Sequence, residues 1–184
     1  MNKIILGLVG PIASGKEETK KYLIKKYNAK DCRFSTMLRD VLNRISIPTS
    51  RENMQKVSTV LRANFGEDLL AKGIANDASK LDANVVVIDG VRRLTDIEHL
   101  VELQNFFLIK IEAGDKLRYE RMIKRNENPG DREKTFEQFK KDHETEADSQ
   151  VPSVMKTAKY SIDNNGTFED LYIQIDGIVG KLTN

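Results

Sequence analysis

Short apolar runs alternate along the chain with longer, charged stretches in which apolar residues recur at helical spacing. A chain that alternates in this way is typical of a parallel β-sheet covered by helices. We therefore predict an α/β fold whose strands lie at residues 3–9, 31–34, 85–89, 106–112 and 159–163.

Capping patterns mark the starts of two predicted helices. Thr49 and Glu52 form a capping-box pattern ahead of a stretch whose apolar residues share one face. Thr167 with Asp170 caps the predicted last helix. The apolar residues of that helix keep three-to-four spacing, so we expect them to pack against the sheet: Phe168, Leu171, Tyr172, Ile175, Ile178, Val179 and Leu182.

The composition narrows the classes of function. Hydrophobic residues make up 39% and charged residues 32% of the chain, an ordinary balance for a globular protein. Lys and Arg number 30 against 28 Asp and Glu, so no broad field of one sign favours a nucleic acid or a membrane surface as partner. Cys32 is the only cysteine, which excludes an intramolecular disulfide and predicts a reducing, cytoplasmic setting. The apolar run at residues 4–9 is too short to span a membrane.

The segment from Gly10 to Lys16, GPIASGK, has the G-x-x-x-x-G-K spacing of a phosphate loop. Such a loop turns its backbone N–H groups inward, and glycine permits both the turn and the close approach of a phosphate. The lysine adds a mobile positive charge for the β- and γ-phosphates. The segment also stands between a predicted strand and a predicted helix, as the motif requires. The predicted ATP-binding residues here are Gly10, Ala13, Ser14, Gly15, Lys16, Glu17 and Glu18.

The residue after Lys16 departs from the usual motif. A serine or threonine hydroxyl commonly ligates magnesium at this position, and this chain has Glu17. Its carboxylate can hold the metal through water, or it can act only as a favourable acid in the first turn of the helix. The sequence leaves both interpretations open.

The apolar run at residues 85–89 ends in an acid. An aspartate at the carboxyl end of a buried parallel strand lies at the crevice where such sheets bind ligands. We predict a magnesium-associated or water-orienting role for Asp89, with a simple cap of the turn at Gly90 as the alternative. Arg92 and Arg93 follow at once and are predicted to bind a phosphate in the same crevice, although exposed arginines are common.

Three further arginines are spaced to share one helix face. Arg118, Arg121 and Arg125 precede a helix-breaking Asn-Pro-Gly at residues 128–130. Guanidinium groups on a segment that closes over ATP would stabilise charge on the transferring phosphoryl group, and Arg121 and Arg125 are the preferred catalytic candidates. The alternative is a solvated face. The stretch at 135–146 has two phenylalanines as its only large apolar residues, so we expect it to be peripheral or mobile.

Four segments together resemble the P-loop nucleotide-kinase superfamily. They are GLVGPIASGK at 7–16, STMLR at 35–39, DGVR at 89–92 and YSIDNNGTFEDL at 160–171. The likeness covers nearly the whole chain and is to archaeal adenylate-kinase-related proteins, deoxynucleoside monophosphate kinases and dephospho-CoA kinases. Phosphate loops followed by an acidic residue also occur among the deoxynucleoside monophosphate kinases.

The resemblance implies a single three-layer P-loop kinase domain over residues 1–184, with a five-stranded parallel sheet flanked by helices. It implies a helical acceptor-binding region at about 35–80, a lid at about 118–135, and Mg²⁺-ATP as phosphoryl donor. Glu17 and Asp89 would serve the metal, directly or through water. The implied acceptor-binding residues are Ser35, Arg39, Arg92 and Arg93, and Asn164, Asn165 and Gly166 would lie near the adenine, unless they form only an Asn-Gly turn.

Charge helps to choose the acceptor. A phosphate acceptor is already ionised and needs cations around it, whereas a sugar hydroxyl benefits from a carboxylate that receives its proton. Dephospho-CoA kinases carry such an acid just after the second strand, where this chain has no acid before Asp40 but does have Arg39. We therefore expect a nucleoside or deoxynucleoside monophosphate, with dephospho-CoA as the alternative. Because of Glu17, a regulatory ATPase that transfers no phosphate is a third hypothesis. The sequence leaves both a monomer and a homodimer open.

Overall fold

Five parallel strands form the centre of the molecule in a computed structural model that describes residues 3–126, 130–142 and 149–183. The strand order is β2-β3-β1-β4-β5. The chain leaves β1 toward one edge of the sheet and reaches the other edge through β4, so β1 ends at the switch point where such sheets bind ligands. The predicted strands are confirmed to within one residue: β1 (Ile4–Val9), β2 (Lys30–Arg33), β3 (Val85–Asp89), β4 (Phe106–Glu112) and β5 (Tyr160–Asp163).

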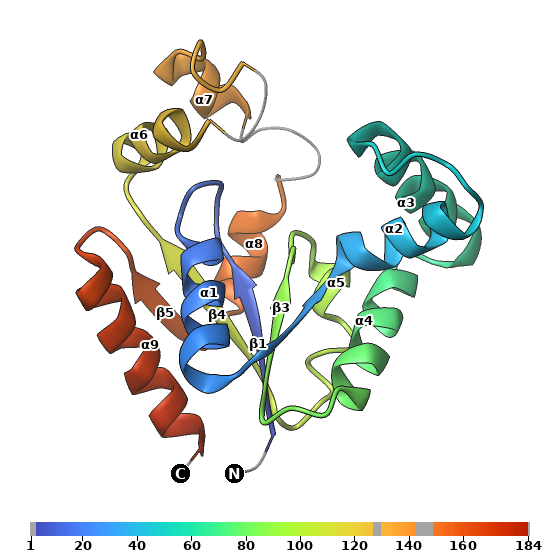
Figure 1. The fold of residues 1–184 in the computed structure, drawn as a ribbon, viewed down its shortest axis with the longest axis horizontal. Helices are drawn as coiled ribbons and strands as arrows, with labels where there is room; N and C mark the ends of the chain where they lie inside the picture. Colours follow the sequence, from blue (N-terminus) through green and yellow to red (C-terminus); the bar gives the residue numbers. More distant parts are fainter. Residues whose placement is uncertain (1–2, 127–129, 143–148, 184) are drawn as a thin grey trace.

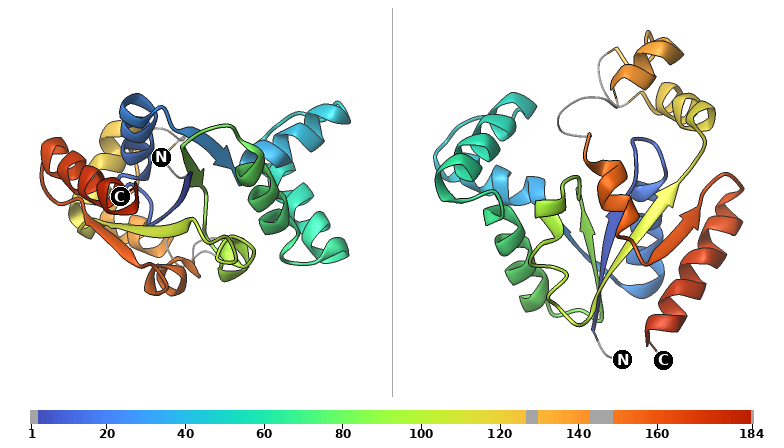
Figure 2. Two further views of the ribbon diagram at one scale, coloured as in Figure 1. Left: turned by 90° about the horizontal axis from the view of Figure 1, so that it is seen from below. Right: turned by 180° about the vertical axis from the view of Figure 1, so that it is seen from behind.

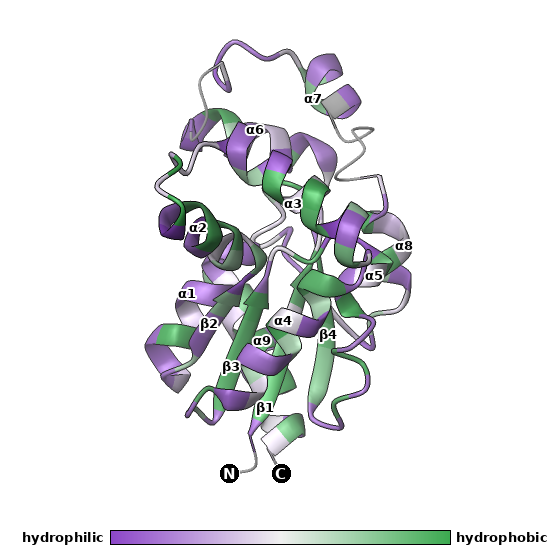
Figure 3. Ribbon diagram, turned by 90° about the vertical axis from the view of Figure 1, so that its right-hand side faces the viewer, coloured by the Kyte–Doolittle hydropathy of each residue, from purple (hydrophilic) through white to green (hydrophobic). Residues whose placement is uncertain are grey.

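Helices cover both faces of the sheet (Figures 1 and 2). On one face α1 (Lys16–Tyr27) and α9 (Phe168–Thr183) pack on the side chains of alternate strand residues. On the other face lie α4 (Leu69–Lys80), α5 (Leu94–Ile97) and α8 (Val151–Lys156). Because both faces are buried, the central strands β1, β3 and β4 are apolar along most of their length (Figure 3), whereas the edge strands β2 and β5 carry polar residues. The predicted three-layer α/β fold is confirmed.

Two pairs of helices stand above the carboxyl ends of the strands, on opposite sides of the molecule (Figure 1). The α2–α3 arm consists of α2 (Phe34–Arg44) and α3 (Arg51–Phe65). The α6–α7 arm consists of α6 (Asp115–Arg125) and α7 (Phe136–Asp142). The end of β1 lies between the two arms, so any ligand bound there faces both.

The helix boundaries confirm one capping prediction and correct another. Asp170 accepts a hydrogen bond from the backbone N–H of Thr167, and the Thr167 hydroxyl accepts one from the N–H of Asp170. At α3 the cap is Ser50, whose hydroxyl accepts from the backbone N–H of Asn53 at 3.2 Å, and not Thr49. Ser50 is the last extended residue before the helix, so its side chain is the one that reaches the first turn.

The apolar stripe of α9 packs largely as predicted. Leu171, Ile175, Ile178 and Val179 are buried against the sheet, whereas Phe168 remains 59% exposed. Helix α6 ends at Arg125, and Asn126 follows in a left-handed conformation. Of the predicted Asn-Pro-Gly breaker, residues 128 and 129 lie outside the described part of the chain.

Candidate functional site

The segment between β1 and α1 folds as a tight loop. Ala13 and Gly15 both have positive φ angles, 58° and 114°. A Cβ atom at Gly10 would collide with the carbonyl oxygen of Ile111 on β4, and one at Gly15 would collide with the amide of Asn164. Glycine is therefore required at both positions, because the backbone curls directly against the ends of neighbouring strands.

Lys16 lies within the curl of this loop. Its ammonium donates to the carbonyl oxygens of Gly10 at 2.6 Å and Pro11 at 2.9 Å. Lys16 is also the first residue of α1, and the first N–H groups of a helix have no partner inside the helix. A movable positive charge and the positive end of a helix thus meet at the carboxyl end of the sheet, an arrangement that suits polyphosphate.

A hydrogen bond from the side chain of Asn164 holds the loop in place. Asn164 follows β5, is 3% exposed, and its side-chain amide donates to the carbonyl oxygen of Ser14 at 2.8 Å. Asn165 and Gly166 are exposed, and the Asn165 side chain accepts a hydrogen bond from the backbone N–H of Gly114. The placement of these three residues near an adenine stays a prediction, but the buried side chain of Asn164 holds the loop and does not line an open surface.

The side chain of Glu18 turns away from the loop. Its carboxylate accepts a hydrogen bond of 2.7 Å from the hydroxyl of Tyr172 on α9. The predicted contact of Glu18 with ATP therefore falls to its backbone N–H in the first turn of α1 and not to its side chain.

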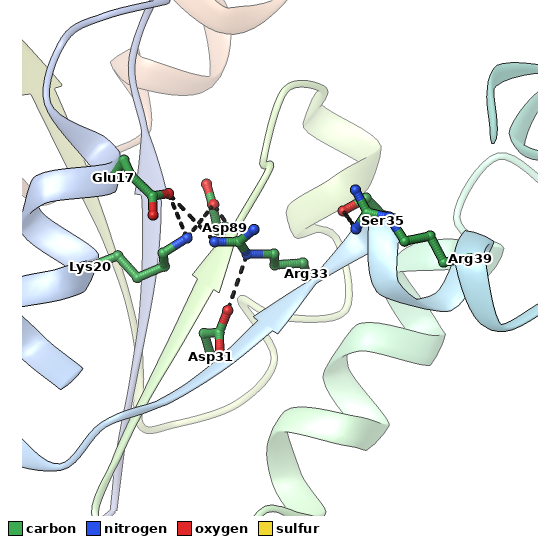
Figure 4. Close-up of polar contacts among 7 residues, drawn as sticks. All are labelled: Glu17, Lys20, Asp31, Arg33, Ser35, Arg39 and Asp89. Carbon is green, nitrogen blue, oxygen red and sulfur yellow. Dashed lines mark hydrogen bonds and ion pairs between the residues drawn. The ribbon is translucent and has the colours of Figure 1, made fainter. Parts of the chain in front are cut away.

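Five charged residues gather beside the loop, and we call them the charged cluster (Figure 4): Glu17, Lys20, Asp31, Arg33 and Asp89. The ammonium of Lys20 lies 2.6 Å from Glu17 Oε2 and 3.3 Å from Asp89 Oδ2, so both predicted metal-binding carboxylates converge on one cation. Arg33 Nε lies 3.1 Å from Asp31 and 3.6 Å from Asp89, and Arg33 Nη2 lies 3.4 Å from Glu17.

Sequence reasoning missed Lys20 and Arg33, although two signals pointed to them. Lys20 stands three residues after Glu17, on the same side of a helix. Arg33 and Asp89 are direct partners in the register of β2 and β3. The second signal needs the strand order, which the sequence alone does not provide.

The fit of magnesium to this cluster is partial. Carboxylates are the ligands that magnesium prefers, and each can hold the ion through water while phosphate oxygens supply other positions. Direct ligation by both Glu17 and Asp89 does not fit, because the Lys20 ammonium lies between them. Over the described residues, no group of three or more His, Cys, Asp or Glu side chains is placed to hold a metal ion.

The α6–α7 arm contacts the loop through Arg118. This side chain is 6% exposed, donates to the carbonyl oxygen of Ile12 at 3.1 Å and to Asp115 at 2.7 Å, and lies 5.2 Å from the ring centre of Phe139. Arg121 is partly buried, and burial lowers the pKa of its guanidinium; Arg125 is exposed. The catalytic roles of Arg121 and Arg125 stay a prediction; the contact between α6 and the loop is made by Arg118, in the first turn of α6.

Helix α7 lies at the outer end of the α6–α7 arm (Figure 1), and its phenylalanines pack against α6. Phe139 is 1% exposed, and the ring of Tyr119 on α6 lies 5.4 Å from Phe136 and 5.7 Å from Phe139, centre to centre. The two phenylalanines of α7 pack on Tyr119 of α6 and not on the sheet, in keeping with the prediction that the stretch at 135–146 is peripheral. Residues 143–146 of that stretch lie outside the described part of the chain.

The predicted acceptor-binding residues lie on two elements. Ser35 and Arg39 are on α2, where Arg39 Nη1 donates to the Ser35 hydroxyl at 2.9 Å (Figure 4). Arg92 and Arg93 follow β3. Asp40, next to Arg39, is exposed and lines a cavity of about 360 Å³ with Arg33, Thr36 and Asp77, between β2, α2 and α4.

A buried ion pair fixes the turn that carries Arg92 and Arg93. Asp96 Oδ2 accepts hydrogen bonds from the backbone N–H groups of Arg92 and Arg93, at 2.9 and 3.0 Å. Asp96 Oδ1 accepts from Arg62 of α3 at 2.8 Å, and the side chains of Arg62 and Asp96 are 7% and 5% exposed. Asp96 therefore links the turn to the α2–α3 arm. Neither Arg62 nor Asp96 was singled out from the sequence.

Comparison with known sequences places the chain among archaeal proteins. A UPF0200 protein of Staphylothermus marinus is 34% identical over 131 residues, which cover 71% of this chain and 68% of the relative. The chain belongs to the UPF0200 family. A UPF0200 protein of Methanocaldococcus jannaschii is 23% identical over 183 residues, 98% of this chain and 91% of that one. No protein-family model matches the chain.

Solved structures similar to this UPF0200 chain share its fold. TT1252 from Thermus thermophilus superposes with a TM-score of 0.69 at 16% identity, over 100% of both chains. Shikimate kinase from Bacteroides thetaiotaomicron gives 0.63 at 12% identity, over 98% of this chain and 99% of the kinase. A gluconokinase from Sinorhizobium meliloti 1021 gives 0.55 at 11% identity, over 98% and 93%. The predicted P-loop kinase-like fold is thus confirmed for this UPF0200 protein.

A membrane span requires a helix of sufficient length and hydropathy. Among the residues that the structure describes, no helix of this UPF0200 chain is long and apolar enough to cross a bilayer.

Proposed function

We propose that this UPF0200 protein is an ATP-dependent phosphotransferase that transfers the γ-phosphoryl group to a nucleoside or deoxynucleoside monophosphate. The observation that carries the proposal is the position of Lys16. Its ammonium is held on two carbonyl oxygens inside a loop at the end of β1, from which it can move to the β- and γ-phosphates. The fold likeness to shikimate kinase and gluconokinase supports transfer to a small molecule.

Each part of the molecule has a role in this proposal. The loop and the first turn of α1 hold the phosphates of ATP, and magnesium arrives with the nucleotide. Arg118 keeps the α6–α7 arm against the loop, so the arm acts as the lid, and Arg121 and Arg125 lie on the same helix. Over residues 35–80, the α2–α3 arm and α4 form the acceptor-binding region of a single domain.

The charged residues proposed to bind the acceptor favour a phosphate group as the acceptor. Arg39 on α2 and Arg92 after β3 are both exposed, and planar guanidinium groups bind phosphate oxygens in pairs. A phosphate acceptor needs no base, because its oxygen is already ionised.

Dephospho-CoA is the second candidate. Its acceptor is a hydroxyl, which benefits from a carboxylate base. Asp40 lines the cavity between β2, α2 and α4 and is the observation that favours this acceptor. The 160–171 segment, which resembles the end of dephospho-CoA kinases, supports it as well.

An assay of ADP release with a panel of acceptors tests the proposal. The panel holds AMP, the deoxynucleoside monophosphates, dephospho-CoA and a sample without acceptor. We expect a monophosphate to stimulate turnover, and Lys16→Ala to lower it by roughly 100-fold or more, as the loss of one electrostatic contact to the transition state does. Slow hydrolysis that no acceptor stimulates would instead identify a regulatory ATPase, and near-normal transfer by Lys16→Ala would remove the role given to the loop.

A further inference from the structure

Lys20 is a buried charge in an unusual place. Its side chain is 2% exposed and lies on α1, one turn after Glu17. A buried ammonium is stable only when it is paired, and Lys20 has two carboxylate partners, Glu17 at 2.6 Å and Asp89 at 3.3 Å. The fold thus holds a cation between the end of β3 and the start of α1.

The surrounding charges are nearly balanced without any metal. The charged cluster has three carboxylates and two cations, Lys20 and Arg33. Arg33 reaches both Glu17 and Asp89, so each of these carboxylates already has two positive neighbours. The attraction of such a site for a divalent ion is much weaker than that of two unpaired carboxylates, because like charges at this range repel.

We propose that Lys20 is a resident cation of the phosphate site, which takes the position that a directly ligated divalent ion would need between Glu17 and Asp89. The nucleotide-free protein therefore does not load metal on these carboxylates. A metal ion bound to the phosphates of a nucleotide would be held by Glu17 and Asp89 through water. The proposal concerns the protein without nucleotide, so it stands or fails separately from phosphoryl transfer.

Titration of the nucleotide-free protein with Mn²⁺, followed by the EPR signal of the free ion, tests this directly. We expect wild type to show no saturable binding below about 1 mM, the weak end of the range for protein oxygen sites. Lys20→Met keeps the buried stem and removes the charge, so binding should tighten by roughly tenfold or more. Lys21→Met is the matched control, because it removes a charge from the next, exposed residue, and its binding should equal that of wild type.

A double variant tests whether the gain in Mn²⁺ affinity depends on the carboxylates. Lys20→Met combined with Asp89→Asn should lose the added affinity. Lys20→Gln replaces Lys20→Met if the latter does not fold, as judged by circular dichroism.

Several results would overturn the proposal. One is tight, saturable Mn²⁺ binding by wild type that Lys20→Met does not improve. Another is a gain in Lys20→Met no larger than that in Lys21→Met. A measurement on wild type tests the proposal even if no variant at Lys20 folds. Mg²⁺ without nucleotide should leave the melting temperature of wild type unchanged. A rise in the melting temperature that saturates with Mg²⁺ concentration would contradict the proposal that Lys20 is the resident cation.

Discussion

The side-chain amide of Asn164 donates a 2.8 Å hydrogen bond to the carbonyl oxygen of Ser14, although 150 residues separate them in sequence. Both residues are buried, and the amide fills the space where a Cβ atom at Gly15 would stand. The shape of the phosphate loop therefore depends on the end of β5 as well as on the loop's own glycines.

Asn164→Ala should weaken ATP binding by deforming the loop. The substitution leaves the buried oxygen of Ser14 without its donor, at a cost of about 1–3 kcal/mol. Calorimetric titration with a non-hydrolysable ATP analogue, together with the melting temperature, measures both effects. Asn64→Ala is the control, because Asn64 is exposed on α3 and its side chain bonds only within its own helix. Unchanged affinity in Asn164→Ala would show that the loop keeps its shape without this contact.

Arg39→Lys and Arg92→Lys should raise the KM for the acceptor and leave the KM for ATP little changed. Lysine keeps the charge but loses the planar, paired contacts that guanidinium makes with phosphate. If the acceptor is a phosphate, Asp40→Asn should have only a small effect on turnover and on both KM values. Both constants are measured with AMP, the deoxynucleoside monophosphates and dephospho-CoA. The phosphate-acceptor proposal fails if dephospho-CoA alone is turned over and Asp40 proves indispensable.

Asp96→Ala should be strongly destabilising. It removes the buried carboxylate that pairs with Arg62, whose other contacts are to the carbonyl oxygen and the exposed carboxylate of Glu67, at a cost of about 3–5 kcal/mol. It also frees the turn that carries Arg92 and Arg93. Urea denaturation measures the loss of unfolding free energy. Glu52→Ala breaks the exposed pair with Lys56, whose side chains are 75% and 68% exposed, and should cost less than about 1 kcal/mol. Equal losses in the two variants would show that Asp96 has no special structural role.

His99 should make stability fall as the pH rises above neutrality. Its imidazole is hydrogen-bonded to Asp68 at 2.8 Å, and this bond raises the pKa of His99 above 6.5. Hydrogen bonds from Lys72 and His99 lower the pKa of Asp68 to about 2. The pair is thus fully charged from about the ordinary pKa of Asp68, 3.8, up to 6.5, and its contribution is lost as His99 deprotonates above its raised pKa.

The melting temperature of wild type and of His99→Gln as a function of pH measures this effect. The difference between them should shrink as the pH is raised from about 6 to about 9. A difference that stays constant over this range would mean that the imidazole does not titrate with a raised pKa.

Local patterns in the sequence were enough to predict the sheet and the phosphate loop. The central strands β1, β3 and β4 are largely apolar runs because both faces of the sheet are buried there, and the loop is a contiguous motif. The capping box at Thr49 misled because the next residue, Ser50, is an equally good cap and stands one position closer to the helix.

Two of the contacts missed from the sequence join residues that are distant along the chain. Lys20 meets Asp89 across 69 positions, and Arg62 meets Asp96 across 34. No spacing rule reveals such pairs. The three arginines of α6 share a face as predicted, but which of them reaches the loop depends on where β4 ends and on how α6 leaves it.

The aromatic packing of Tyr119, Phe136 and Phe139 gives the α6–α7 arm an interior of its own. Substitutions within that interior disturb the arm and leave the packing around the sheet intact. Because these three residues lie outside the two clusters that pack on the sheet, the arm should tolerate changes in length and composition with little effect on the folding of the rest. Divergence among relatives of this protein is therefore expected to concentrate in the arm, while the loop beneath it stays the same.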